Sequence, residues 1–211
     1  MANIKLPYGK GFLEVEIPDE RLNAILESDI NKYKPELGEV DLVREALENP
    51  IGTPKLRDMA KGKKKVVIIA SDHTRPVPSK VIMPLMLEEI RKGNPDADIT
   101  ILISTGCHRE TTKEELIEKF GPEIVAKEKI HVHNCDDESM LVNIGVLPSG
   151  GLLIINKLAV EADLLVAEGF IEPHFFAGFS GGRKSVLPGI ASRATVMYNH
   201  NAEFIDNEKA R

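Results

Sequence analysis

The chain has 211 residues, which is enough for one sizeable hydrophobic core or two small ones. Its 42% apolar and 28% charged residues are typical of a soluble globular protein, and its net charge of −6 argues against sequence-independent nucleic-acid binding, which needs a basic surface. No run is long enough for a membrane span, and the N-terminus lacks the apolar core of a signal peptide. The two cysteines form no C-x-x-C pair, so we expect a cytoplasmic, reducing location without membrane association.

The first 60 residues combine a hairpin signal with helical spacing. Residues 3–17 alternate apolar and polar side chains around Tyr8-Gly9-Lys10-Gly11, which predicts a β-hairpin. Residues 19–38 are polar, and we expect them to cross the surface. The spacing of apolar residues in 40–47 and 54–60 predicts two helices.

From residue 66 onward, predicted strands and helices alternate. Residues 66–70, VVIIA, form a β-branched run that is typical of a strand buried on both faces. The elements expected after it are a helix at 79–93, a strand at 96–104, a helix at 113–121, a strand at 129–136, a β excursion at 141–156, a short helix at 157–163 and a strand at 163–170. This order indicates an α/β fold with a mostly parallel sheet and flanking helices, Rossmann-like, preceded by the N-terminal β-hairpin.

The sequence predicts one domain, with no helix stop signal at its C-terminal end. No linker is evident, so residues 1–211 are expected to form one domain. The last residues, NAEFIDNEKAR, resemble the middle of a helix without a glycine or proline stop. We therefore expect this domain to belong to a longer protein.

Three of the predicted strands are followed directly by polar residues. Residues 66–70 precede Ser71-Asp72-His73-Thr74-Arg75, residues 96–104 precede TGCHRE, and residues 163–170 precede Glu172-Pro173-His174. Ligands of open parallel sheets bind beyond the carboxyl ends of the strands, and right-handed crossovers bring such loops to one edge. We expect a cluster at that edge, formed by Asp72, His73, Arg75, His108 and His174.

Each member of this cluster has a structural alternative. Asp72 can simply cap a turn, and His73 can be an exposed loop residue. Arg75, held extended by the following proline, suits a carboxylate but could also be a surface cation. His108 and His174 lie beside glycine or proline at strand ends and are the better candidates for proton transfer at neutral pH.

Other side chains suited to catalysis or metal binding favour structural roles. His131 and His133 alternate along one predicted strand and share a face, but no third ligand accompanies them at metal-site spacing. Cys107 could be a nucleophile, although a small buried thiol is the commoner case. A zinc hydrolase based on histidine would need three ligands at one site, and the spacings do not supply them.

A glycine-rich segment follows the last predicted strand. Ser180 is placed to cap a helix, and Gly181 and Gly182 let the backbone approach a ligand. A helix start offers free N–H groups to an anion, and Lys184 adds a positive charge there. Ser192 is placed to cap a second helix. Turns of this kind also occur purely for tight packing.

The same segment supports two alternative functions. Residues 178–185, GFSGGRKS, nearly fit the phosphate-loop pattern G-x-x-x-x-G-K-[ST]. Arg183 stands where the second glycine should be, and that glycine permits the tight wrap around phosphates, so a phosphate-loop-like nucleotide-binding protein is disfavoured. A non-catalytic isolated domain that associates with a partner domain is the other alternative.

Taken together, the motifs resemble a known family. They are SDHTRPVP (71–78), STGCHRETT (104–112), EPHFFAGFSGGRKSVLPGIA (172–191) and Asn199-His200. In combination they look like the N-terminal domain of the nickel-dependent lactate racemases and their 2-hydroxy-acid racemase and epimerase relatives. The likeness covers nearly the whole chain. Enzymes of that family are longer and carry a second, C-terminal domain that is absent here.

The resemblance implies an isomerase that acts on a small 2-hydroxy acid by proton-coupled hydride transfer. Its cofactor would be a nickel-pincer nucleotide, a modified pyridinium mononucleotide made by dedicated biosynthesis proteins. The isolated domain would be inactive. The implied roles are covalent cofactor attachment for Lys184, nickel ligation for His200, acid/base chemistry for His108 and His174, substrate carboxylate binding for Arg75, and cofactor contact for Asp72, Phe176, Gly181 and Gly182.

The chemistry of the residues agrees with such roles. The α-proton of a 2-hydroxy acid is weakly acidic, so its removal as hydride is easier when a base takes the hydroxyl proton at the same time. The planar keto acid can then receive the hydride on its other face. A histidine on each of two strand ends suits this two-sided site. The identity of the hydroxy acid stays open.

Overall fold

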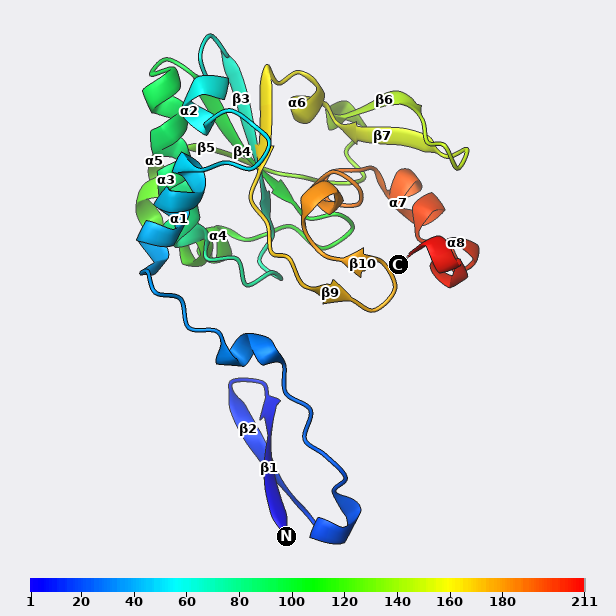
Figure 1. Ribbon diagram of the computed structural model, residues 1–211. Coiled ribbons are helices and arrows are strands. Elements are labelled where there is room, and N and C mark those ends of the chain that lie inside the picture. Colours follow the sequence, from blue (N-terminus) through cyan, green and yellow to red (C-terminus); the bar gives the residue numbers. More distant parts are fainter. Residues whose placement is uncertain (211) are drawn as a thin grey trace. The chain divides into compact units, whose positions relative to one another are not determined.

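The computed structural model describes residues 1–210, apart from the side chain of Asn31. Backbone contacts divide the chain into two compact units, Met1–Gly38 and Glu39–Arg211 (Figure 1). The sequence shows no linker at this boundary. The first unit is small and holds no buried apolar side chain among its described residues.

The first unit is the predicted hairpin with its polar extension. Strands β1 (Ala2–Tyr8) and β2 (Gly11–Ile17) pair antiparallel along their whole length. Gly9, with φ of +56°, supplies the left-handed backbone of the connecting turn. Two single 3-10 turns follow, η1 (Asp19–Arg21) and η2 (Asp29–Lys32). The hairpin prediction is confirmed.

The second unit is built on a four-stranded parallel sheet with the order β5-β4-β3-β8 (Figure 1). Its strands are β3 (Lys65–Ser71), β4 (Asp98–Ser104), β5 (Lys129–Val132) and β8 (Leu164–Ala167). An antiparallel hairpin, β6 (Leu141–Val146) and β7 (Leu152–Asn156), forms the predicted β excursion. The predicted α/β fold with a parallel sheet is confirmed.

Helices flank this sheet, as the alternating pattern predicts. They are α1 (Glu39–Glu48), α2 (Leu56–Met59), α3 (Ser79–Gly93), α4 (Lys113–Phe120), α5 (Pro122–Lys127) and α6 (Lys157–Val160). Helix α7 (Arg193–Asn199) packs instead against β7, and α8 (Ala202–Asp206) follows it. Single 3-10 turns lie at η3 (Glu138–Met140) and η5 (Glu208–Ala210). None of the helices among residues 1–210 combines the length and apolar character that a membrane span requires.

The central strand β3 shows why the sheet is buried on both faces. Val66 and Ile68 point into a large core that they share with α3, α4 and α5, while Val67 and Ile69 point into a smaller core with Leu102 of β4. This period of two on a fully apolar strand divides the side chains between two layers. The sheet is thereby fixed, and its strand ends are held in place.

The strand order creates a topological switch point. The chain moves from β3 to β4 to β5 in one direction, and β8 then adds to the opposite side of β3. In open α/β sheets the crevice for ligands lies at such a reversal, beyond the carboxyl ends of the two strands. Here that position is between the ends of β3 and β8.

The segment after β8 departs from the helix expected at Ser180. It contains a two-residue hairpin, β9 (Pro173–His174) and β10 (Gly178–Phe179), and then one 3-10 turn, η4 (Gly182–Ser185). Its N-cap is Gly181, which makes no side-chain cap, so the prediction that Ser180 caps a helix is wrong. The strand-to-helix context of a phosphate loop is therefore not formed. Ser192 does cap α7, by accepting from the backbone N–H of Thr195.

Candidate active site

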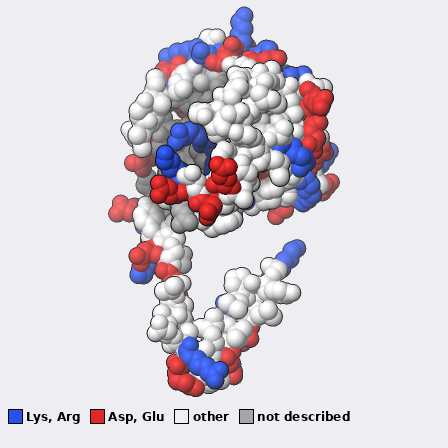
Figure 2. All heavy atoms as spheres, turned by 90° about the vertical axis from the view of Figure 1, so that its right-hand side faces the viewer, with Lys and Arg blue, Asp and Glu red and all other residues white. Residues whose placement is uncertain are grey.

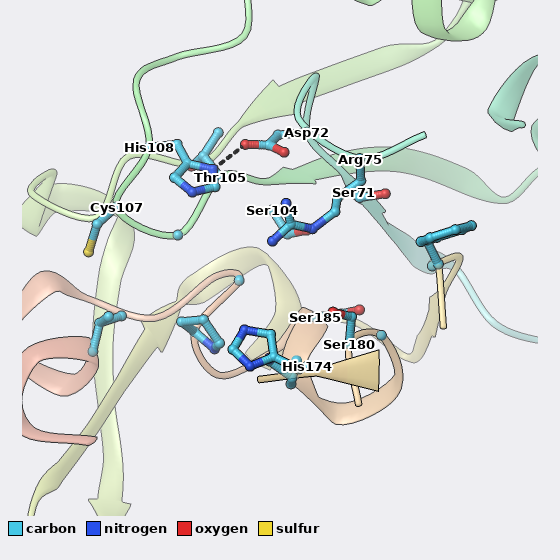
Figure 3. A pocket seen from close by; sticks show the side chains of 18 of the residues that line it. Ser71, Asp72, Arg75, Ser104, Thr105, Cys107, His108, His174, Ser180 and Ser185 are labelled. Atoms are coloured by element: carbon cyan, nitrogen blue, oxygen red, sulfur yellow. Dashed lines mark hydrogen bonds and ion pairs between the residues drawn. The ribbon is translucent and has the colours of Figure 1, made fainter. Parts of the chain in front are cut away.

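A cavity of about 360 Å³ lies beyond the carboxyl ends of β3, β4 and β8 (Figure 3). Its walls come from the ends of β3 and β4 and the loops after them, from the segment between β8 and α7, and from α7 with its C-cap. Eight of the nine residues assigned from the sequence line it: Asp72, Arg75, His108, His174, Phe176, Gly181, Lys184 and His200. The expected meeting of three strand ends is confirmed.

Two predicted members lie elsewhere. Gly182 is exposed and does not line the cavity. His73 was expected in the cluster but lies outside the cavity wall, where its Nδ1 lies 3.1 Å from the hydroxyl of Thr111 and 3.8 Å from the carboxylate of Glu115. The prediction that His73 joins this cluster is wrong, because its ring lies against Thr111 and Glu115 while Asp72 lines the cavity.

Asp72 holds the imidazole of His108. Its Oδ2 lies 2.6 Å from Nδ1 of His108, and its Oδ1 accepts from both the backbone N–H and the hydroxyl of Thr74 (Figure 3). Burial by itself would raise the pKa of Asp72, but hydrogen bonds from Thr74 and His108 outweigh it and keep the pKa low. The ionised carboxylate fixes the His108 proton on Nδ1, which leaves Nε2 free to accept a proton. Asp72 thus combines the structural role of a turn cap with positioning of the histidine.

His174 presents the opposite tautomer. Its Nδ1 accepts from the backbone N–H groups of Phe176 at 3.4 Å and Ala177 at 3.2 Å, so in the neutral ring the proton lies on Nε2. The ring stacks on Phe175, with centroids 4.8 Å apart, and meets Phe176 edge-on at 4.6 Å. Burial, and then the nearby charges of Lys184 and Arg75, lower the pKa of His174. The ring is therefore neutral near pH 7.

The cations of the cavity are Arg75 and Lys184. Within the described part of the chain, neither forms an ion pair, so both charges are available to a ligand. Burial and the charge of Arg75 lower the pKa of Lys184, which increases the fraction of free amine. Figure 2 shows a hollow on the face of the larger unit with Lys or Arg atoms at its wall and Asp or Glu atoms below them. The site suits an anionic ligand on this side.

His200 lies at the C-terminal end of α7, where it is the C-cap. Its Nδ1 lies 3.2 Å from the carbonyl oxygen of Val196. Since a carbonyl oxygen only accepts, Nδ1 carries the proton and Nε2 keeps a free lone pair. The ring of Phe176 lies edge-on to it at 6.0 Å. The hydrogen bond to Val196 holds the ring in one orientation and one tautomer.

Glycine is required at positions 181 and 182 for different physical reasons. Gly181 has φ of +78°, and a Cβ there would meet the carbonyl oxygen of Phe170 at 2.8 Å. Gly182 has φ of +57° with open space around it. Gly181 is therefore required by close packing of the backbone as well as by its conformation, whereas Gly182 is required by conformation alone. The hydroxyl of Ser180, which caps no helix, lies 3.5 Å from a carboxylate oxygen of Glu172.

The surroundings of His133 and of the two cysteines give these residues no part in proton transfer. His133 is buried, with Nε2 3.1 Å from the carbonyl oxygen of Ala191 and Nδ1 3.2 Å from the amide nitrogen of Asn156, a structural role. Cys107 lines the cavity, and burial together with Cys107 raises the pKa of Cys135 to about 11. Among residues 1–210, no group of three or more His, Cys, Asp or Glu side chains is placed to hold a metal ion.

Several cavity residues were given no role by the sequence, among them Ser71 and Glu168. Ser71 is the last residue of β3, and Glu168 directly follows β8. Each is the first polar position after an apolar run, the same signal that marks Asp72. The signal is weak for Ser71 because serine is common at strand ends, and for Glu168 because it falls within the strand predicted at 163–170.

The sequence is similar to lactate racemases. The family model for the lactate racemase N-terminal domain matches residues 8–211. The chain is 60% identical over 211 residues to the lactate racemase of Thermoanaerobacterium thermosaccharolyticum and 55% identical to that of Lactiplantibacillus plantarum. Each match covers 100% of this chain and 50% of the relative, so the chain spans about half the length of these proteins.

Solved structures agree with this similarity. The lactate racemase apoprotein from Thermoanaerobacterium thermosaccharolyticum superposes with a TM-score of 0.90 at 58% identity, over 100% of this chain and 49% of that one. A protein from Thermotoga maritima superposes with a TM-score of 0.63 at 25% identity, over 82% of this chain and 41% of that one. The resemblance seen in the motifs is confirmed.

Proposed function

Because the chain belongs to the lactate racemase N-terminal domain family, we propose that a protein carrying it interconverts the enantiomers of a small 2-hydroxy acid of the lactate type. The observation that supports this most is the presence of His108 and His174 in one cavity, where each ring has a fixed tautomer. The second half that its relatives carry would complete the substrate site. A cytoplasmic location and cofactor supply by dedicated biosynthesis proteins belong to the same proposal.

The residues of the cavity fit a nickel-pincer nucleotide. Lys184 offers a partly buried amine of lowered pKa, which suits covalent attachment to the cofactor. His200 offers an unprotonated Nε2 on a ring held by Val196, which suits a nickel ion that is otherwise bound by the pincer. Phe176 offers an aromatic ring beside His200. When bound, this cofactor supplies the acceptor for the hydride that leaves the α-carbon of the substrate.

The two histidines manage the hydroxyl proton. His108 accepts it at Nε2, and the ionised Asp72 stabilises the imidazolium that forms. His174 is neutral near pH 7 and reaches the cavity from a different strand end. In our proposal each histidine serves one enantiomer, because the hydroxyl groups of the two enantiomers point in different directions when the carboxylate is held at one place.

Arg75 holds the substrate carboxylate in this proposal. Its planar guanidinium matches a carboxylate in a two-pronged contact, and its charge is not used by an ion pair within residues 1–210. Fixing the carboxylate leaves the α-carbon as the pivot of the reaction. The hydroxy acid itself is not determined by these residues, because half of the relatives' length lies outside the chain.

The test is a racemisation assay with the chain completed by the second half of a relative and loaded with cofactor. We expect L-lactate to be converted to a mixture of both enantiomers, measured by chiral chromatography. His108→Ala and His174→Ala should each abolish conversion while the covalently bound cofactor, seen by intact mass spectrometry, is retained. Full activity in both variants would refute the proposed acid/base pair.

A further inference from the structure

Two buried polar atoms of the cavity lack a hydrogen-bond partner. Among the described residues, these are the hydroxyl oxygen of Ser71 and Oε2 of Glu168. Glu168 is 5% exposed, and its other oxygen, Oε1, accepts from the hydroxyl of Ser79 at 2.5 Å. Buried polar groups are nearly always paired, because an unpaired one loses its hydrogen bonds to water without replacing them. Two such atoms in one cavity indicate that something else pairs with them.

Both residues lie at the topological switch point of the sheet. Ser71 ends β3, and Glu168 extends β8 by donating its backbone N–H to the carbonyl oxygen of Ile69. These two strands are neighbours on either side of the reversal in strand order. The general position for ligands in such sheets is this crevice. Both residues line the cavity at this crevice, where the fold itself favours binding.

The chemistry of the two groups selects the kind of ligand. A carboxyl group repels phosphate and carboxylate groups, which are drawn instead to Arg75 and Lys184. One hydroxyl group of a ligand can donate to Oε2 of Glu168, and a second can accept from the hydroxyl of Ser71. In Figure 3, Ser71 and Arg75 lie on the same side of the cavity, across from His174 and Ser180. A ligand with an anionic group and a sugar could use both kinds of contact at once.

We propose that Glu168 and Ser71 form a subsite for the ribose hydroxyl groups of the nucleotide. This inference rests on the proposed function, because it assigns the sugar part of the cofactor proposed there. The structure also contains a matched control. Ser104 lies directly opposite Ser71 in the register of β4 and β3 and lines the same cavity, but its hydroxyl donates to the carbonyl oxygen of Ala70 at 3.0 Å.

The test measures binding of two probes to the cofactor-free chain by titration calorimetry. The probes are nicotinic acid mononucleotide and its 2′,3′-dideoxyribose analogue. We expect the wild-type chain to bind the ribonucleotide about tenfold more tightly, as two modest hydrogen bonds would give. Glu168→Leu and Ser71→Ala should each reduce this preference, and Ser104→Ala should leave it unchanged. If Glu168→Leu fails to fold, as judged by circular dichroism, Ser71→Ala carries the test.

Three results would overturn the subsite. Equal affinity of the wild-type chain for both probes would mean that the sugar hydroxyls do not reach these atoms, while the proposed function would stand. An equal effect of Ser71→Ala and Ser104→Ala would indicate general disturbance of the cavity. Absence of binding for both probes would refute the nucleotide part of the proposed function, and the subsite with it.

Discussion

Nδ1 of His108 lies 2.6 Å from Oδ2 of Asp72, a carboxylate that is almost fully buried while half of the histidine side chain is exposed. This contact fixes which nitrogen of His108 can accept a proton. Asp72→Asn keeps the shape but can donate its amide to Nδ1, which would favour the wrong tautomer. We expect kcat for racemisation to fall by a factor on the order of 10²–10⁴, measured with the cofactor-loaded protein of full length.

Thr74→Ala is the matched control for this prediction. It removes the hydroxyl that donates to Asp72 but leaves the backbone N–H of residue 74 on the same oxygen. We expect a loss well below that of Asp72→Asn, because the contact with His108 is retained. A similar loss in the two variants would show that Asp72 acts by holding the loop and not by holding His108.

Lys184 is the only residue to which we assign covalent attachment of the cofactor. Lys184→Ala should prevent the added mass seen by intact mass spectrometry of natively produced protein. Lys184→Arg is the sharper variant, because it keeps the positive charge but offers no amine that can be acylated. We expect no added mass in either variant. An adduct that persists in Lys184→Arg would place the attachment at another residue.

The nickel content tests the role of His200. His200→Ala removes Nε2, the ring nitrogen left unprotonated when Nδ1 donates to Val196. The amount of nickel per protein chain, measured by elemental analysis at limiting nickel, should fall by roughly 10–100-fold. His73→Ala is the control, because His73 lies outside the cavity beside Thr111. Equal nickel in wild type and His200→Ala would exclude His200 as a ligand.

The sequence predicts the sheet well because strands buried on both faces carry a strong local signal. The apolar run of β3 is followed directly by polar residues. This pattern alone predicts that Asp72 and Arg75 lie at the site. The segment after β8 is predicted poorly. In this segment the backbone of Gly181 lies close to the carbonyl group of Phe170, eleven residues earlier in the chain, a contact that no local pattern encodes.

The direction of individual side chains is also beyond local patterns. His73 and Asp72 are adjacent, yet only Asp72 faces the cavity, because Thr111 and Glu115 offer His73 partners on the other side. Glu168 illustrates the reverse case. Its position after an apolar strand predicts no particular role. Only the structure shows that one of its carboxyl oxygens is buried without a hydrogen-bond partner.

Alanine substitutions at Gly181 and Gly182 distinguish the cost of backbone strain from the cost of a steric clash. Alanine at either position has to adopt a positive φ, which costs roughly 1–2 kcal/mol. Only Gly181→Ala also drives a Cβ against the carbonyl oxygen of Phe170, which adds about 1–3 kcal/mol. Urea unfolding of the chain should therefore show a clearly lower free energy of unfolding for Gly181→Ala than for Gly182→Ala. Equal losses would mean that the backbone shifts freely at Gly181.

Glu168 gives the stability of the chain a dependence on pH. Burial raises its pKa, and the hydrogen bond from Ser79 and the charge of Lys119 offset this only in part. A group whose pKa is raised on folding contributes stability that is complete below its unfolded value, about 4.3, and is lost as the pH rises through the folded pKa. Glu168 therefore destabilises the folded chain at alkaline pH.

Glu168→Gln should remove this penalty, because glutamine resembles the protonated acid. We expect a melting temperature above that of the wild type at pH 8, by a few degrees, and equal to it near pH 4, measured by thermal unfolding of the cofactor-free chain. Glu89→Gln is the control. Glu89 is buried to the same extent but pairs with Arg57 and Lys92, so its variant should melt below the wild type at pH 8. A lowered melting temperature for Glu168→Gln at pH 8 would mean that Glu168 is paired in solution, and that its carboxylate stabilises the fold.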